Sequence, residues 1–442
     1  MHDVRGNPTS TTSPVALEHA ERALWRLISF FGDPQPDLDA AAASDPGWAL
    51  PHIMKAGFWL TLTERRWQAD AAAAIAAAEQ RAGTAHERER LLLQGVQLGW
   101  RGDWEGACRC WDTVLRRWPC DGLALIWAHL FDFHRGDAYE LRRRVARVLP
   151  QWSEDDPLYP YLLGMLAFGF EEDHLHREAE DHGRRALAHG VVVPWAVHAV
   201  AHVMEMQGRY DEGAAWLRQH QAAWSQGSGF AGHLWWHLGL FRLERLDTEG
   251  ALRLYDEHLS GDAVQIALQR LDATALLWRL HLLGVDTGPR FTTLASGWDT
   301  APEHSGWSPF NDLHVMLALL GADRVDQARA WLAQVERGTA EWQAAGLRER
   351  DEAAAVGLTL QRGLLQHAQG DDTQALETLL KARSQSQRIG GSHAQRDLID
   401  QTLLAAAARG GHRGMGRALL GERHGARAVT PLAQHWAGRF AG

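Results

Sequence analysis

Eight short breaks recur at nearly regular spacing along this sequence, and they constrain its fold more than any other feature. The breaks fall at Gly102, Gly136, Glu172, Gly208, Leu246, Gly284, Gly321 and Gly370. The spacings between them are 34, 36, 36, 38, 38, 37 and 49 residues. Between the breaks, apolar residues recur every three or four positions, which predicts α-helices rather than strands. A unit that repeats every 34 to 38 residues predicts an array of stacked helical hairpins.

The residues at the breaks have the chemistry that a turn between two antiparallel helices needs. Glycine adopts the left-handed conformation that ends a first helix, and the Asp or Thr that follows caps the second helix. A small residue then lets the paired helices approach closely, at Ala107, Gly213, Gly250, Ala328 and Ala375. This combination is typical of tetratricopeptide-type repeats. The sequence therefore predicts an all-α fold, a tetratricopeptide-like α-α superhelix.

The array is expected to form one continuous domain over residues 15–442, because no stretch rich in Gly, Pro or Ser divides it. The hairpin repeats cover about residues 85–410, with capping helices at both ends. Additional helices are expected at 15–31, 47–64, 66–82, 85–101 and 432–440. Residues 1–14 are polar and lack helical periodicity, so we expect a disordered tail there.

Composition excludes several function classes. The net charge of −10 and the lack of a basic run disfavour nucleic acid as a partner. No apolar stretch of about 18 residues occurs, so no membrane span is expected, and the N-terminus lacks the apolar segment of a secretory signal. Cys108, Cys110 and Cys120 form no disulfide or metal pattern, so the expected location is the cytoplasm. No phosphate-binding loop or nucleophile elbow is present, and no cofactor is expected.

Histidines and carboxylates replace apolar residues on the expected inner helices of successive hairpins. Counted back from the following break, their positions fall near one helical face. Neighbouring inner helices lie about 8–10 Å apart, so we expect these side chains to line a concave groove. The residues of this stripe are His198, His202, Glu205, His233, Trp236, His237, Asp272, Asn311, Asp312 and His314.

A second candidate segment, residues 390–397, reads GGSHAQRD. Two glycines end one helix, and Ser392 is placed to cap the next. Gln395, Arg396 and Asp397 then fall near the first turn of that helix. One interpretation is a helix junction with an Arg–Asp pair. In the other, the arginine reaches the mouth of the groove and binds a carboxylate.

Several interpretations of the stripe are open. The leading hypothesis is a groove that binds a small molecule or a peptide segment. Histidines spaced i, i+4 beside carboxylates also suit a metal platform or acid–base catalysis. The weak metal candidates are His198, His202, His233 and His237. The catalytic candidates are His202, Glu205, His237 and Asp312. The alternatives are a scaffold for a protein partner, and histidines that only hydrogen-bond between stacked helices.

Five segments taken together resemble the tetratricopeptide repeat protein 38 family, found in animals and with bacterial relatives. They are AHVMEMQGRYDEGAAWL (201–217), HLWWHLGLFRLE (233–244), LYDEHL (254–259), FNDLHVMLALLGA (310–322) and GGSHAQRD (390–397). The resemblance spans roughly residues 20–410, with the segments in the same order. It implies an all-helical tetratricopeptide-like solenoid and no particular reaction. Its motifs fall on the stripe, which favours a site there over simple packing.

Overall fold

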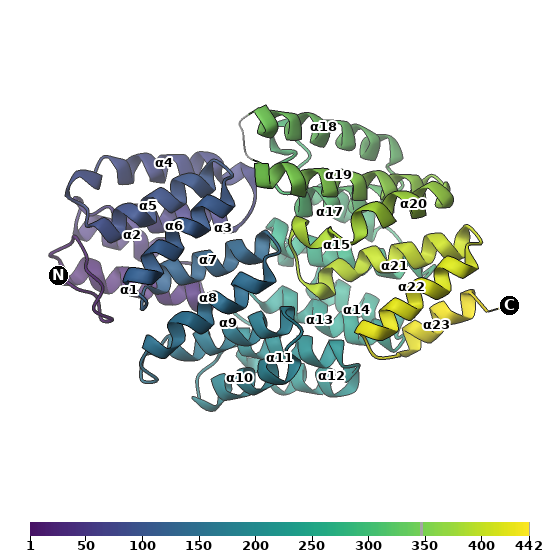
Figure 1. The fold of residues 1–442 in the computed structure, drawn as a ribbon, viewed down its shortest axis with the longest axis horizontal. Helices are drawn as coiled ribbons and strands as arrows, with labels where there is room; N and C mark the ends of the chain where they lie inside the picture. The colour runs from purple at the N-terminus through teal and green to yellow at the C-terminus, as the bar shows by residue number, and fades with distance from the viewer. Residues whose placement is uncertain (345–347, 442) are drawn as a thin grey trace. The chain divides into compact units, whose positions relative to one another are not determined.

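The computed structural model describes residues 1–344 and 348–441, and no β-strand occurs among them. The chain divides into two compact units. Unit 1 is Met1–Val200 with Ala223–Phe230, and unit 2 is Ala201–Ala222 with Ala231–Gly442. Consecutive helices pair along the chain within each unit (Figure 1). The predicted all-α, tetratricopeptide-like architecture is therefore confirmed, while the single domain over residues 15–442 stays a prediction.

Unit 1 consists of helical hairpins in chain order. Its helices are α1 (Pro14–Ser29), α2 (Gln35–Ser44), α3 (Leu50–Thr61), α4 (Gln68–Glu79), α5 (Glu87–Trp100), α6 (Trp104–Arg117), α7 (Gly122–His134), α8 (Ala138–Val148), α9 (Tyr159–Glu172) and α10 (His176–Ala188). Helix α2 fills the gap between two expected helices. It carries Pro36 in its first turn, where the fixed φ of proline suits a helix and its missing N–H is not needed.

The N-terminal segment corrects one expectation, because residues before α1 pack on unit 1 instead of forming a disordered tail. Thr11 is only 1% exposed. Arg5 forms ion pairs with Glu21 at 2.8 Å and with Asp156 at 3.0 Å. The segment is held by ion pairs and hydrogen bonds rather than by an apolar face, so hydrophobic periodicity could not reveal it.

Unit 2 contains the rest of the array. Helix α11 (Pro194–Met206) crosses the boundary between the units. The helices that follow are α12 (Tyr210–Gln219), α13 (Ala231–Glu244), α14 (Thr248–His258), α15 (Ala267–Leu282), α16 (Arg290–Gly297), α17 (Pro309–Gly321), α18 (Val325–Ala344), α19 (Arg348–Ala368), α20 (Asp372–Arg383), α21 (His393–Arg409), α22 (Arg413–Ala426) and α23 (Pro431–Arg439). The first helices α13, α15, α17 and α19 pack in sequence, while α21 returns against α15 and α23 against α13.

The backbone at the breaks confirms the predicted turn chemistry. A residue with φ between 57° and 85° stands at each break, six times at the predicted position and twice two residues later. The two shifts put His174 and Asp323 in the left-handed conformation in place of Glu172 and Gly321. Gly321 instead ends α17, where an added Cβ would lie 2.4 Å from the ring of Phe291. Small size, rather than backbone freedom, explains glycine at that position.

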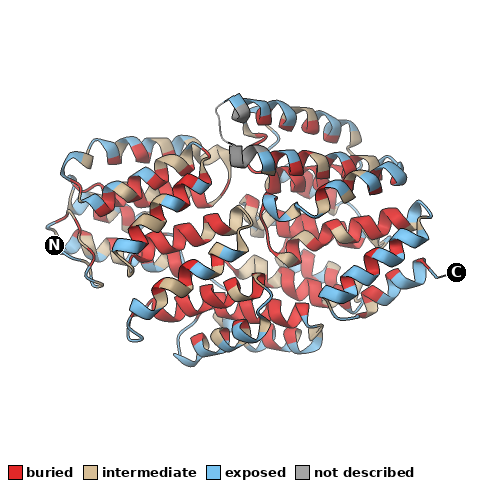
Figure 2. Cartoon of the chain, viewed as in Figure 1, coloured by how far each residue is buried: buried red, intermediate tan, exposed pale blue. Residues whose placement is uncertain are grey.

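First and second helices differ in burial, as stacked hairpins require. Helix α9 is buried along nearly its whole length, whereas α10 buries only Ala179, Gly183 and Ala186 (Figure 2). Aspartates cap second helices as predicted: the side chain of Asp103 accepts the N–H of Gly106 at 2.8 Å. None of the helices described is both long and apolar enough to cross a membrane.

Candidate functional site

Three of the predicted histidines meet inside unit 2. His202 lies on α11, and His233 and His237 lie one turn apart on α13. Nε2 of His237 is 3.2 Å from Nε2 of His233, and the ring centroid of His202 is 4.4 Å from that of His237. Each histidine offers a ring nitrogen within 4.8 Å of the others. His202 and His237 are buried, and His233 is half-buried.

The two histidines of α13 each contact a carboxylate through their other nitrogen. Nδ1 of His237 is 3.2 Å from Oε2 of Glu205 on α11. Nδ1 of His233 is 2.7 Å from Oδ2 of Asp272 on α15. An ionised carboxylate can only accept, so these contacts place the proton of each neutral imidazole on Nδ1. We call these five residues, His202 included, the polar cluster.

Residues 390–397 contact the cluster from α21. Ser392 and Gln395 form a reciprocal capping box at the start of that helix, as the sequence suggested for Ser392. Nε2 of Gln395 then donates to Oδ1 of Asp272 at 3.0 Å. Arg396, which one of the two interpretations placed at the mouth of the groove, donates to the carbonyl of Gly391 beside its own helix. In this segment it is therefore Gln395 that holds a carboxylate of the cluster.

The C-terminal segment adds two arginines that sequence reasoning missed: Arg423, which is buried, and Arg427, which is half-buried. Nη1 of Arg427 donates to Oε1 of Glu205 at 3.1 Å, and its Nε lies 3.8 Å from Oδ1 of Asp397. Arg423 pairs with Asp397 and, at 3.4 Å, with Glu244. Both arginines follow the last break, so no repeat register was available to place them. The surface predicted as a concave groove is thus part of the buried interior of unit 2.

Charge and burial set the protonation of this region. Burial alone would raise the pKa of Asp397, but Arg423 and Arg427 hold it well below its usual range. Burial raises the pKa of Glu244 above that of a free glutamate. Burial, aided by the neighbouring histidines, lowers the pKa of His237 well below its usual value. His237 is therefore a neutral imidazole at pH 7.

Three buried side chains beside the cluster keep a polar atom that has no hydrogen-bond partner among the described residues. The atoms are Nε of Arg279, Nε1 of Trp236 and Nε2 of His314. The three residues are at most 1% exposed. The guanidinium carbon of Arg279 lies 5.6 Å from the ring centroid of Trp236, and Trp236 contacts the ring of His237. Arg279 was another residue that the sequence did not single out, because arginine is abundant in this chain.

The existing hydrogen bonds of Arg279 and His314 determine whether their unpaired nitrogens are donors or acceptors. Arg279 donates to the carbonyls of Ala275 and Ala394 at 3.0 and 2.6 Å. Nδ1 of His314 lies 2.7 Å from the carbonyl of Phe310 and must donate to it, so Nε2 is an acceptor. Burial lowers the pKa of Arg279 to about 10 and that of His314 to about 4. The three free atoms are therefore two donors and one acceptor.

His198 stands one turn before His202 on α11, in the part of the helix that belongs to unit 1. Its ring packs against two phenylalanines with centroids 5.0 and 5.2 Å away. Asn311 and Asp312 stand in the first turn of α17. Oδ1 of Asp312 accepts the N–H of Gly306 at 3.3 Å, so this carboxylate helps to hold the preceding loop.

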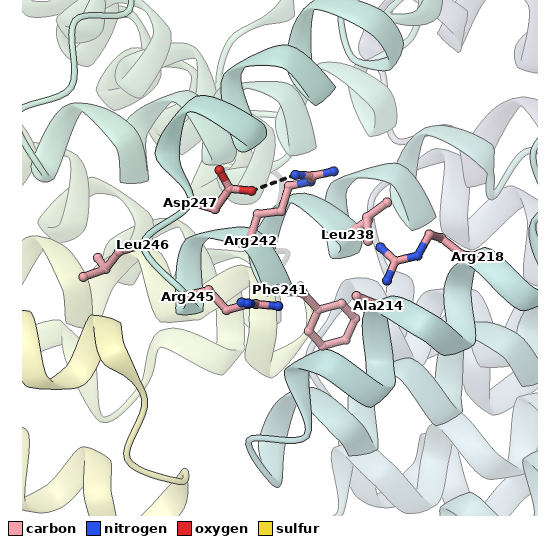
Figure 3. A pocket seen from close by; sticks show the side chains of 8 residues that line it. All are labelled: Ala214, Arg218, Leu238, Phe241, Arg242, Arg245, Leu246 and Asp247. Atoms are coloured by element: carbon pink, nitrogen blue, oxygen red, sulfur yellow. Dashed lines mark hydrogen bonds and ion pairs between the residues drawn. The ribbon is translucent and has the colours of Figure 1, made fainter.

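A separate pocket of about 330 Å³ lies between α12 and α13 in unit 2 (Figure 3). Three arginines reach it: Arg218, Arg242 and Arg245. Arg242 pairs with Asp247 at 2.7 Å, and Arg245 pairs with Asp211. Two of the three cations are thus already balanced, which makes the pocket a weaker anion site than its residue types suggest.

Comparison with known proteins adds little beyond the architecture. No family model matches the chain. The solved structures similar to it include the human IFIT1 dimer with PPP-AAAA, at 14% identity and a TM-score of 0.36, covering 84% of this chain and 78% of that one. Another is the human IFIT1 dimer with m7Gppp-AAAA, at 14% identity and a TM-score of 0.40, covering 97% and 90%. The expectation that nucleic acid is not a partner stays a prediction from the net charge and the lack of a basic run.

Proposed function

We propose that this helical-repeat protein binds a small polar molecule or a peptide segment inside unit 2. The site consists of the polar cluster together with Arg279, Trp236 and His314. The observation that carries the proposal is the set of three orphaned polar atoms on those last three side chains. Leaving a buried donor or acceptor unpaired costs about 1–3 kcal/mol, and native proteins keep few such groups. A ligand that completes them offsets this cost.

The free atoms define the chemical class of the ligand. Arg279 and Trp236 need oxygen acceptors, which a carboxylate or a carbonyl supplies. Nε2 of His314 needs an N–H or O–H donor. A molecule that carries both, such as an amino acid, a hydroxy acid or the end of a short peptide, satisfies all three atoms. The flat ring of Trp236 supplies apolar contact area beside them.

The test compares two arginines of the same unit. Arg279→Met keeps the aliphatic stem and removes the donors, while Arg242→Met makes the same change at the surface pocket. Thermal unfolding is followed with a panel of amino acids, hydroxy acids and dipeptides. We expect at least one compound to stabilise the wild type and Arg242→Met but not Arg279→Met.

The same variants separate binding from a structural role. If Arg279 only stabilises the fold, Arg279→Met should lose several kcal/mol without any ligand, as when one partner of a buried charge pair is removed. If Arg279 also serves a ligand, the variant should in addition lose the rise in unfolding temperature that the compound produces in the wild type. The absence of any stabilising compound, together with a destabilised Arg279→Met, would contradict the proposal.

A second candidate function is acid–base catalysis at the same cluster. The supporting observation is the pair of His–carboxylate contacts, His237 with Glu205 and His233 with Asp272. A carboxylate on Nδ1 orients an imidazole for proton transfer through Nε2. Turnover lost in His233→Gln with ligand affinity unchanged would support it.

On the five segments quoted above, we also propose that the chain is a bacterial relative of the tetratricopeptide repeat protein 38 family.

A further inference from the structure

The Nε2 atoms of the two histidines of α13 face each other. Glu205 and Asp272 hold the Nδ1 atoms of His237 and His233, which puts both protons on that side of the rings. The two Nε2 atoms then face one another 3.2 Å apart. Two neutral imidazoles that face each other in this way repel unless a proton or a metal ion lies between them. The nitrogen of His202 lies within 4.8 Å of both.

We propose that His202, His233 and His237 form a binding site for a first-row transition-metal ion such as Zn²⁺. Imidazole nitrogens are preferred ligands of such ions. The Zn–N distance is about 2.0–2.1 Å, so two nitrogens of a tetrahedral site lie about 3.3 Å apart, close to the spacing of the Nε2 atoms. Three imidazole ligands are a usual protein donor set for such an ion.

The surroundings have the features of an outer coordination shell. Metal-binding histidines usually donate their second N–H to a carboxylate, which orients the ring and makes the ligand more basic. Glu205 and Asp272 occupy those positions here, and Arg427 and Gln395 hold the two carboxylates in turn. Two of the three proposed ligands therefore have a carboxylate behind them that is itself held by another side chain.

The charge balance of the region also favours a cation. The buried carboxylates of unit 2 around the cluster are Glu205, Glu244, Asp272 and Asp397. The guanidiniums that face them are those of Arg279 and Arg423, which are buried, and of Arg427, which is half-buried. Four anions against three cations leave one negative charge in excess in a low-dielectric interior, where an unbalanced charge is costly. Added positive charge at the histidines opposes this excess.

Metal binding is measured on the full chain after chelator treatment and dialysis, with Zn²⁺ titrated calorimetrically and Co²⁺ followed by its visible absorption. We expect one ion per chain, absorption bands of tetrahedral Co²⁺, and a higher unfolding temperature with metal than without. The variant of choice is His233→Gln, because His233 is half-buried and its change is the least disruptive to the fold. Its matched control is His258→Gln, which replaces a histidine stacked on Trp235 outside the cluster.

His233→Gln should abolish or strongly weaken Zn²⁺ binding, while His258→Gln should bind as the wild type does. Asp272→Asn should weaken binding about 10- to 100-fold, the usual effect of losing a carboxylate behind a metal-bound histidine. Circular dichroism checks that each variant is folded. Arg279→Met should still bind Zn²⁺, so the metal-site proposal can hold even if the ligand-binding proposal fails. Lack of Zn²⁺ binding by the wild type, or equal binding by His233→Gln, would overturn the metal site and leave a proton shared between the two imidazoles.

Discussion

The substitution Asp397→Asn tests whether the buried ion pairs hold the C-terminal helices onto the inner helices of unit 2. The change keeps the shape of the side chain and removes its charge. Asp397 contacts Arg423 and lies 3.8 Å from Arg427, and all three side chains are buried or nearly so. The remaining contact of Asp397, with Nε2 of Gln401 at 2.8 Å, can persist with an amide oxygen.

The magnitude follows from what the two arginines retain. Removing one partner of a buried ion pair typically costs about 3–5 kcal/mol. Arg423 keeps Glu244 and Arg427 keeps Glu205, so we expect the low end, about 3 kcal/mol at pH 7. The folded-state pKa of Asp397 lies below its ordinary value, so the stabilisation is fully present above a pH of about 4. It is lost as the pH falls through the lower folded pKa, and the variant should approach the wild type there.

The assay is urea unfolding at pH 7, with limited proteolysis to locate cleavage within unit 2. The control is Asp400→Asn, one turn further along α21, where Asp400 pairs with the partly exposed Arg383 at 2.6 Å. Because a pair near the surface contributes little, the control should change stability by less than about 1 kcal/mol. Equal stability of the two variants would refute the idea that Asp397 clamps the C-terminal segment.

Three further predictions address the turns, the packing and the pH response. Gly213→Ala should cost about 1–3 kcal/mol, because its Cβ would lie 2.4 Å from the buried ring of Phe241; Gly232→Ala, with open space around it, should be neutral in the same thermal unfolding assay. Asp103→Ala should cost about 1 kcal/mol through the lost cap of α6, with Asp103→Asn near the wild type. The pKa of His314 is lowered to about 4 in the folded chain, so the unfolded chain binds more protons between about pH 6.5 and that value. Stability should therefore fall by up to about 3 kcal/mol as the pH drops through this window, and urea unfolding of His314→Gln should show a shallower loss.

Much of the repeat architecture could be predicted because it is local. A left-handed residue followed by a capping aspartate depends on a few neighbouring positions, so Gly102 and Asp103 could be assigned without knowing any long-range contact. The i, i+4 spacing of His233 and His237 likewise fixed a shared helical face. The pairing of these histidines with Glu205 and Asp272 was not predicted, because the spacing places side chains no more finely than one helical turn.

Other parts could not be predicted, because their partners are distant in sequence. The N-terminal segment shows no periodicity, since it is held by Arg5 and other polar contacts. The carboxylate of Asp312 and the guanidinium of Arg396 instead bind nearby backbone, as a side chain in the first turn of a helix readily does.

The sequence by itself determined the helices, the turns between them and which side chains share a helical face, because these depend on spacing within about one repeat. Only the tertiary structure decided that α21 and the C-terminal helices return against α15 and α13. That return buries the predicted groove and brings Arg423 and Arg427 to carboxylates more than 20 residues away. It also places the uncompensated atoms of Arg279 and His314 beside the histidines. Burial converts a row of ordinary polar residues into a site, because charges and lone pairs removed from water must find partners within the fold.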